Sequence, residues 1–139
     1  MISSTAEYAL RAALYLARFG GTGPVRVEEI ADALAVPRNY LSKVLGVLAR
    51  RGLLRSLRGP HGGFELAVPA SSLSLGDVVG AFVETETRPS CLLGGAACVN
   101  ECGCPVRERW EWVAGEYAAF FRETCVQDVA GGVSGSRDV

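Results

Sequence analysis

The 139-residue chain is poor in the residues and patterns on which most enzymes depend. It contains a single histidine, and it has no P-loop, no dinucleotide-binding glycine fingerprint and no Ser/His/Asp combination. No apolar run approaches the roughly eighteen residues of a membrane-spanning helix, and the chain does not open with a basic segment followed by an apolar one. We therefore expect a cytoplasmic protein that is not an enzyme, takes no small-molecule substrate and contacts no membrane.

Charge is scarce and unevenly placed. The chain is 49% hydrophobic with a net charge of −1, as expected of one folded domain of ordinary size. Residues 38–61 nevertheless hold six basic side chains and no acidic one, whereas residues 84–128 hold eight acids against four bases. A solvated surface usually mixes the two signs, so the basic block indicates binding of nucleic-acid phosphates.

The basic block begins within a predicted helix-turn-helix. Residues 3–18 are rich in Ala and Leu and predict a largely buried helix, and apolar residues at helical spacing predict two more helices at 27–34 and 38–51. The short connection at 35–37 is typical of a helix-turn-helix, and an ordinary helical hairpin is the alternative. Gly46 in the last helix predicts a close packing contact. The residues expected to meet base edges are Arg38, Asn39, Tyr40, Ser42 and Lys43.

A β-wing is predicted next. Residues 53–58 and 64–68 alternate with period two, and a loop of glycine, proline and histidine separates them. Two strands with such a tip after a helix-turn-helix predict a winged helix. The tip would place Arg58 and His61 at a minor groove or at phosphates. The DNA-contacting residues expected here are Arg58, Gly59, Pro60, His61 and Gly62.

The C-terminal part predicts two more helices. Ser74 and Asp77 form a capping-box pattern ahead of a short helix. A long helix is predicted from Pro105 to about residue 129, with Cys104 as an N-cap whose thiolate the helix dipole favours. Its apolar side chains follow the 3-4 spacing of a seam for a second copy of the chain. Cys125 is expected to serve packing, and residues 130–139 to be disordered.

Four of the five cysteines lie within residues 91–104. Clustered soft thiolates on a glycine- and alanine-rich loop suit an iron–sulfur cluster, zinc or copper(I). A reactive-thiol loop or a disulfide are the alternatives. An odd number of cysteines in a reducing compartment argues against a disulfide framework.

Together these motifs resemble the IscR/NsrR (Rrf-type) family of bacterial winged-helix transcription regulators over residues 1–127. The resemblance rests on Tyr8-Ala9-Leu10-Arg11, Glu29-Ile30-Ala31, Tyr40-Leu41, Gly52-Leu53-Leu54, the segment 58–64 and the cysteine loop. It implies a mainly α fold with a small β-wing, divided into a DNA-binding domain (1–83), a cluster loop (84–104), a dimerisation helix (105–129) and a tail (130–139). It also implies a homodimeric repressor on a palindromic DNA operator, controlled by a [2Fe–2S] or [4Fe–4S] cluster that senses redox, nitric oxide or iron–sulfur status.

The resemblance also implies a set of cluster ligands. The three family cysteines correspond to Cys91, Cys98 and Cys104, and Cys102 is additional. One branch of the family has a histidine where this chain has Arg107. In the nitric-oxide-sensing branch an acid on the first helix of the other subunit completes the cluster, and Glu7 holds that place. Glu7 could instead serve only its helix N-terminus, with Cys102 as the fourth ligand.

Three other interpretations remain open. The same fold could bind zinc or use a thiol switch. The chain could be a small iron–sulfur electron-transfer protein. It could also be a winged-helix module for protein interaction, although its expected recognition surface is basic and amide-bearing rather than apolar or acidic.

Overall fold

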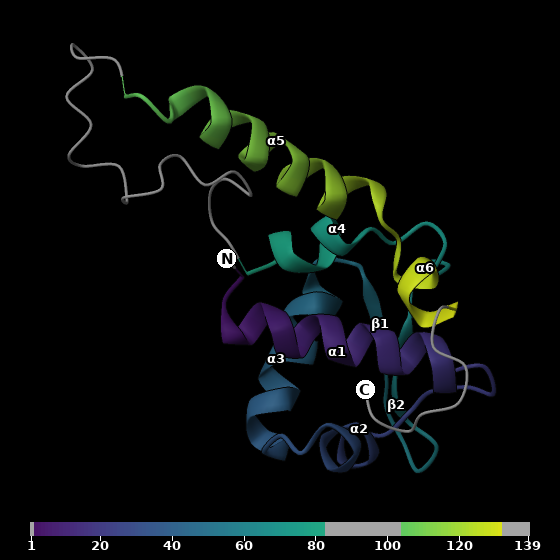
Figure 1. The fold of residues 1–139 in the computed structure, drawn as a ribbon. Coiled ribbons are helices and arrows are strands. Elements are labelled where there is room, and N and C mark those ends of the chain that lie inside the picture. The colour runs from purple at the N-terminus through teal and green to yellow at the C-terminus, as the bar shows by residue number, and fades with distance from the viewer. Residues whose placement is uncertain (1, 83–103, 132–139) are drawn as a thin grey trace.

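The computed structural model describes residues 2–82 and 104–131. This part of the chain is mainly helical with one small antiparallel sheet, as the sequence predicts. The elements are α1 (Ser4–Phe19), α2 (Val27–Leu34), α3 (Arg38–Arg50), β1 (Leu54–Leu57), β2 (Gly63–Leu66), α4 (Leu75–Gly80), α5 (Arg107–Glu123) and α6 (Val126–Gly131) (Figure 1).

Helix α1 lies at the centre of the fold. The Ser3 side chain caps it by accepting a hydrogen bond of 3.2 Å from the Ala6 N–H. Small side chains on a helix let its neighbours approach closely, and α1 packs against α2, α3, α4, α6 and β2. Its fully buried side chains are alanines: Ala6, Ala9, Ala12 and Ala13.

Helices α2 and α3 form the predicted helix-turn-helix. The turn passes through Ala35, whose backbone is left-handed with φ 53°. Its N–H bonds the Asp32 carbonyl at 3.3 Å, and the Val36 N–H bonds the Ala31 carbonyl at 3.0 Å. These bonds terminate α2, and α3 begins after a connection of only three residues. Ile30 from α2 and Leu41 and Leu45 from α3 are fully buried between them and α1.

The wing is a two-stranded antiparallel hairpin with Leu54 opposite Leu66 and Leu57 opposite Gly63. Strand β1 lies inside its predicted range, whereas β2 begins one residue before its predicted range, at Gly63, and ends two residues sooner. Val25, just ahead of α2, pairs with the free edge of β2 as a third backbone segment. Its N–H donates to the Phe64 carbonyl at 2.9 Å, and its carbonyl accepts from the Phe64 N–H at 2.8 Å. The wing is therefore joined through its second strand to the segment that leads into the helix-turn-helix.

The predicted capping box of α4 is present. The Asp77 N–H bonds the Ser74 hydroxyl and the Ser74 N–H bonds the Asp77 carboxylate, each at 3.0 Å. Helix α4 then packs closely on α5. A Cβ added to Gly76 would lie 3.1 Å from the Phe121 carbonyl oxygen, so glycine permits this approach.

The prediction of one C-terminal helix up to residue 129 is wrong. Helix α5 ends at Glu123, and Thr124 is extended with ψ 122°. The Thr124 carbonyl accepts a bond of 2.9 Å from the Leu75 N–H, and the Val126 N–H bonds the Leu73 carbonyl at 2.8 Å. Long-range pairing thus replaces the helical bonds at this point. Ala130 and Gly131, which were expected in a disordered tail, belong to α6.

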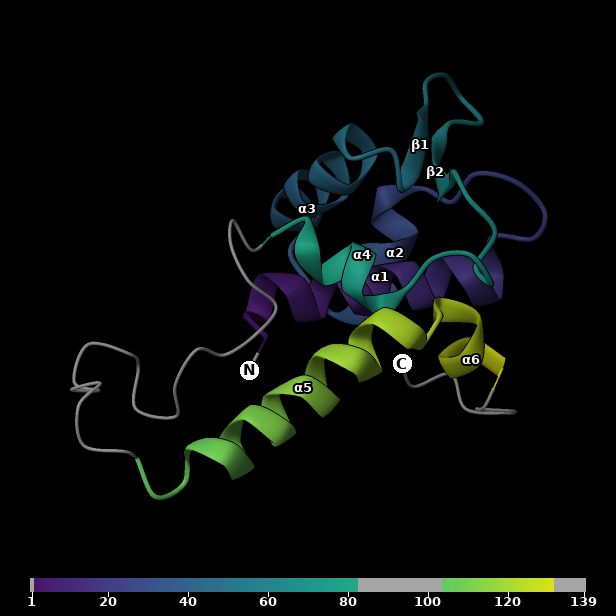
Figure 2. The same ribbon diagram turned by 90° about the horizontal axis from the view of Figure 1, so that it is seen from above.

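Helix α5 lies on the opposite side of α1 from α2 and from the tip of the wing in both views (Figures 1 and 2). Its first turns extend beyond the rest of the described chain, while its last turn rests on α4. In the described ranges we find no helix with the length and apolar character needed to cross a membrane.

Candidate nucleic-acid interface

The outward face of α3 carries the predicted recognition residues. The inward face buries Leu41, Val44, Leu45 and Leu48, with Ala49 partly buried beside them, and the opposite face of the helix is open to solvent. The exposed set includes Arg38, Asn39, Ser42 and Lys43. These side chains supply cationic and amide donors at the N-terminal half of the helix, which is where a recognition helix meets base edges.

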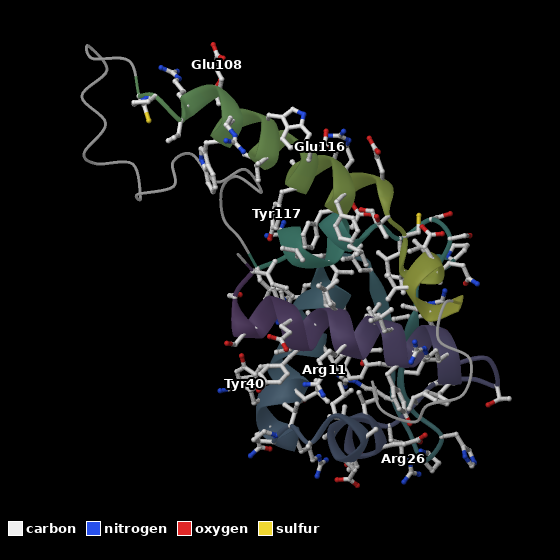
Figure 3. The ribbon with its side chains drawn as sticks, in the orientation of Figure 1. Arg11, Arg26, Tyr40, Glu108, Glu116 and Tyr117 are labelled. Carbon is white, nitrogen blue, oxygen red and sulfur yellow. The ribbon has the colours of Figure 1, made fainter. Side chains whose placement is uncertain are left out.

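Tyr40 is the exception among the predicted contacts. Although it is 37% exposed, its hydroxyl lies 2.7 Å from the Thr5 hydroxyl and its ring meets the edge of Tyr8. Tyr40 thus turns toward α1, and Figure 3 shows it between α1 and α3. Its contacts position the recognition helix on α1.

Arg38 forms an ion pair with Glu28 from the first turn of α2, at 2.7 Å. Both side chains are largely exposed, so this pair contributes little to stability. A phosphate near Arg38 would compete for the same guanidinium. The pair therefore holds Arg38 at the start of α3 without withdrawing it from the surface.

Helix α2 is itself held to α1 by two polar contacts. The Tyr15 hydroxyl donates to the Glu29 carboxylate at 3.1 Å, and Arg11 donates to the Leu34 carbonyl at 3.2 Å. Burial, the hydrogen bond and the negative charge of Glu29 together raise the pKa of Tyr15. Tyr15 therefore remains a neutral donor at ordinary pH and keeps α2 in place.

The wing tip presents the predicted residues to solvent. Arg58, Gly59, Pro60 and His61 are exposed, and Gly62 is half-buried. Gly59 has φ 106°, a conformation that favours glycine, and its carbonyl accepts a hydrogen bond of 3.0 Å from the Gly62 N–H. This tight turn sets Arg58 and His61 at the far end of the hairpin.

Arg26 anchors the wing tip, a role that sequence reasoning did not find. Its guanidinium donates to the Pro60 carbonyl, and Figure 3 shows Arg26 beside the wing. At the start of β2, directly after the tip, Gly63 has φ 150°, and an added Cβ there would lie 2.3 Å from the Val25 carbonyl oxygen. The wing is thus held to the segment 25–26 both at its tip and at the start of its second strand.

An open groove of about 390 Å³ runs between the start of α3 and the wing. Two arginines and the N-terminus of α2 border it, with Glu28 as its one acidic neighbour, so it suits an anionic backbone. Its lining residues are Arg26, Val27, Glu28, Arg38, Ser42, Ser56, Leu57, Gly59, Gly62, Gly63 and Phe64.

Part of the predicted apolar stripe on α5 is exposed to solvent. Val113 and Phe120 are 46% and 54% exposed, and Val106, the N-cap residue seven positions before Val113, is 49% exposed. Trp110 and Tyr117 lie between them at half-buried positions. Such a stripe is typical of a helix that pairs with another helix. Trp112, 68% exposed, lies off this stripe.

The cysteine loop lies mostly outside the described residues, and this includes Cys91, Cys98 and Cys102. Cys104 is described: its thiol is free and exposed. The prediction that Cys104 is the N-cap of this helix is wrong, because the N-cap of α5 is Val106. The Cys104 carbonyl instead accepts a bond of 3.1 Å from the Arg107 N–H. Among residues 2–82 and 104–131 no three potential metal ligands come together.

Glu7 and Cys104 are both accessible donors. Glu7 is exposed on the first turn of α1, and Cys104 precedes the end of α5 that extends away from α1 (Figure 1). Thiolate and carboxylate are ligands that iron accepts, so these two residues fit an iron–sulfur cluster chemically.

Comparison with known proteins places this geometry in context. Residues 2–132 match the Rrf2 family, described as iron-dependent transcriptional regulators. An HTH-type transcriptional regulator of Aquifex aeolicus is 34% identical over 131 residues, which is 93% of this chain and 90% of that protein. The HTH-type transcriptional regulator IscR of Klebsiella pneumoniae is 32% identical over 109 residues, covering 78% of this chain and 66% of IscR.

Among solved structures, the chain is similar to CymR of B. subtilis, whose structure is described as that of the global cysteine regulator. The TM-score is 0.82 at 26% sequence identity, and the alignment covers 96% of this chain and 98% of CymR. The helix-turn-helix, wing and C-terminal helices described above therefore make up the fold of known regulators.

Proposed function

The chain belongs to the Rrf2 family of transcriptional regulators, and on that premise we propose that it is a homodimeric, DNA-binding repressor whose operator affinity depends on an iron–sulfur cluster. Its relatives are regulators rather than enzymes. We place its action in the cytoplasm, on a palindromic DNA operator, with neither a membrane nor a small-molecule substrate as partner. We retain the division into a DNA-binding domain (1–83), cluster loop (84–104), dimerisation segment (105–129) and tail (130–139).

One observation carries the DNA-binding part: the exposed recognition face of α3 and the anchored wing border a single groove with Arg26 and Arg38 on its walls. A duplex seated there would offer base edges to Asn39 and Lys43 and phosphates to Arg58 and His61. Because most of this contact is with phosphates, binding should weaken steeply as salt rises.

Dimerisation is supported by the seam on α5. Three exposed apolar side chains at heptad spacing, two on α5 and one at its N-cap, have no covering element in the described part of the chain. A second copy of α5 would bury them by the same rule that forms a coiled coil. The DNA-binding elements lie on the other side of α1, so each protomer could present its recognition helix to one half of a palindrome.

Control by a cluster is supported by the donors. Cys91, Cys98 and Cys104 would hold it from one subunit, with Glu7 of the other subunit or Cys102 as the fourth ligand. When bound, the cluster would supply redox and nitric-oxide reactivity. Ligands from both subunits would fix the angle between the two DNA-binding domains. Losing them would relax the half-site spacing and change operator affinity.

A thiol switch is the second candidate. It is favoured by the free, exposed Cys104 thiol and by similarity to the fold of a cysteine regulator. In that case oxidation of cysteines, without metal, would alter the geometry of the dimer.

The test is anaerobic purification of the full chain, quantification of iron, sulfide and zinc, and measurement of DNA binding before and after chelation. We expect iron and sulfide in the wild type, and we expect operator affinity to change when iron is removed. The same affinity with and without iron, or in a Cys98→Ala variant, would contradict control by a cluster. Zinc without sulfide, or no metal with oxidant-dependent binding, would favour the second candidate.

A further inference from the structure

Gly46 lies in the middle of α3. Glycine is less favourable there than alanine, because its backbone is freer in the unfolded chain and loses more conformational entropy when the helix forms. A contact with another part of the chain was the expected reason. The described structure offers none: a Cβ added at Gly46 would come near only one atom, Arg50 Nη1, at 3.9 Å. The expected packing contact is therefore absent from the described chain, and the reason for glycine must be sought outside it.

Gly46 belongs to a face that extends over the whole length of α3. The positions 39, 42, 43, 46, 47 and 50 recur at helical spacing and lie opposite the buried leucines. They border an open hollow of about 640 Å³. The lining residues are Asn39, Ser42, Lys43, Gly46, Val47 and Arg50.

The charge of this hollow identifies its occupant. Lys43 and Arg50 are cationic, Asn39 and Ser42 are hydrogen-bonding, and no acidic side chain is among its lining residues. A packing partner made of protein would call for apolar side chains here, whereas only Val47 is apolar. A polyanion with hydrogen-bonding edges fits this set of groups.

The dimensions suit duplex DNA. Arg50 follows Asn39 by eleven positions, which is about 16 Å along a helix axis. The major groove is about 12 Å wide between its two phosphate walls. A helix inclined across the groove can thus place its first turn at base edges and its last turn at a phosphate on one wall.

We propose that α3 binds DNA along its entire outer face, with Gly46 as the point of closest approach and Arg50 as a phosphate contact at the C-terminal end. This inference rests on the proposed DNA-binding function and deepens it. The missing side chain at Gly46 lets the DNA lie against the helix backbone itself, between the contacts made by Asn39 and Arg50. An added methyl group would hold the two surfaces apart.

The Gly46→Ala variant separates this role from a structural one, because the two make opposite predictions. Alanine should stabilise the fold, raising the thermal midpoint by roughly 2–6 °C, and should weaken DNA binding about tenfold or more. Gly115→Ala is the matched control. Gly115 is also in mid-helix, in α5, with nothing within 4 Å of an added Cβ. It should gain similar stability and bind DNA as the wild type does.

Arg50 is tested through the salt dependence of binding. Arg50→Gln should lower the slope of log K against log salt by about one, because one phosphate contact is lost. Its neighbour Arg51 is exposed but does not line the hollow. Arg51→Gln should therefore leave the slope unchanged.

The probe is a duplex that the wild-type full chain selects from a random-sequence pool, with an unrelated duplex of equal length for comparison. The inference is overturned if Gly46→Ala binds this duplex as tightly as the wild type, or if it loses stability and binding together. The assignment of Arg50 as a phosphate contact is also overturned if Arg50→Gln leaves the slope of log K against log salt unchanged. A wild-type chain that selects no duplex overturns the proposed function itself, and this inference with it.

Discussion

The Tyr40 hydroxyl on α3 lies 2.7 Å from the Thr5 hydroxyl on α1, and the Tyr40 ring meets Tyr8 edge-on with centroids 5.8 Å apart. The start of the recognition helix is therefore tied to the first turn of α1, the turn that carries Glu7. If Glu7 is a ligand of the cluster held by the other subunit, this contact directly couples the cluster to the position of the recognition helix. Five predictions test the relationships described above.

Removing the Tyr40–Thr5 hydrogen bond should loosen the recognition helix. We expect Tyr40→Phe and Thr5→Val each to lower the free energy of unfolding by about 0.5–1.5 kcal/mol. The double variant should cost less than the sum of the two single ones, because each removes the same bond. Urea unfolding of the three variants measures this coupling. Additive losses would show that the hydroxyl pair is not a coupled contact.

Gly63→Ala should detach the wing from the segment ahead of α2. With φ 150° and a Cβ site 2.3 Å from the Val25 carbonyl oxygen, alanine forces the backbone to move. We expect a loss of roughly 2 kcal/mol or more in unfolding free energy, together with weaker DNA binding. Gly21→Ala is the control, since nothing lies within 4 Å of its Cβ site. Equal effects at the two glycines would contradict this account.

Tyr15 should make stability depend on alkaline pH. Burial first, and then the hydrogen bond and charge of Glu29, raise the pKa of Tyr15 above its ordinary value. The folded state thus keeps its proton where the unfolded chain loses it, so the contribution is complete below about pH 10 and is lost as pH rises through the folded-state pKa. Urea unfolding across this range and tyrosinate absorbance measure the effect.

Two variants separate the causes of the raised Tyr15 pKa. Tyr15→Phe should remove this part of the pH dependence. Glu29→Gln should only reduce it, because burial is the largest cause. Glu28→Gln is a matched control, since Glu28 pairs with Arg38 instead. A change at Glu28 as large as that at Glu29 would argue against the Tyr15–Glu29 contact.

Two neighbouring residues of α5 should differ in their effect on dimerisation. Val113 lies on the exposed heptad stripe and Trp112 does not, although Trp112 is the more exposed of the two, at 68% against 46%. We expect Val113→Glu to raise the dimer dissociation constant at least about tenfold, because it buries a charge. Trp112→Glu should leave it unchanged. Sedimentation equilibrium measures the dimer dissociation constant of each variant. A larger increase for Trp112→Glu than for Val113→Glu would place the dimer interface elsewhere.

Glu7→Ala should alter the cluster if Glu7 is its fourth ligand. We expect a changed visible spectrum or faster loss of iron in air, with little change in unfolding free energy, because Glu7 is exposed. Asp32→Ala, an exposed acid on α2, is the control. Iron and sulfide per chain are measured after anaerobic purification. Identical spectra and lability in wild type and Glu7→Ala would move the fourth ligand to Cys102 or elsewhere.

Much of this fold could be predicted because its signals are local. The apolar spacing of α2 and α3, the Ser74 capping box and the alternating strands around the glycine tip each reflect neighbours within a few residues along the chain. The exposure of the basic face of α3 could be predicted for the same reason. The cysteine spacing likewise predicts a soft-metal or thiol site, although most of that loop lies outside the described residues.

The remaining features depend on segments that are distant in the sequence. Thr124 leaves the helical conformation because its carbonyl pairs with Leu75, and Arg26 reaches Pro60 across 34 positions. Whether Gly46 meets protein or solvent likewise depends on which elements pack on α3. Amino-acid sequence by itself determined the elements and their chemistry, since periodicity and capping act locally. Only the tertiary structure decided which backbone groups pair and which faces remain open, because long-range contacts override local propensity.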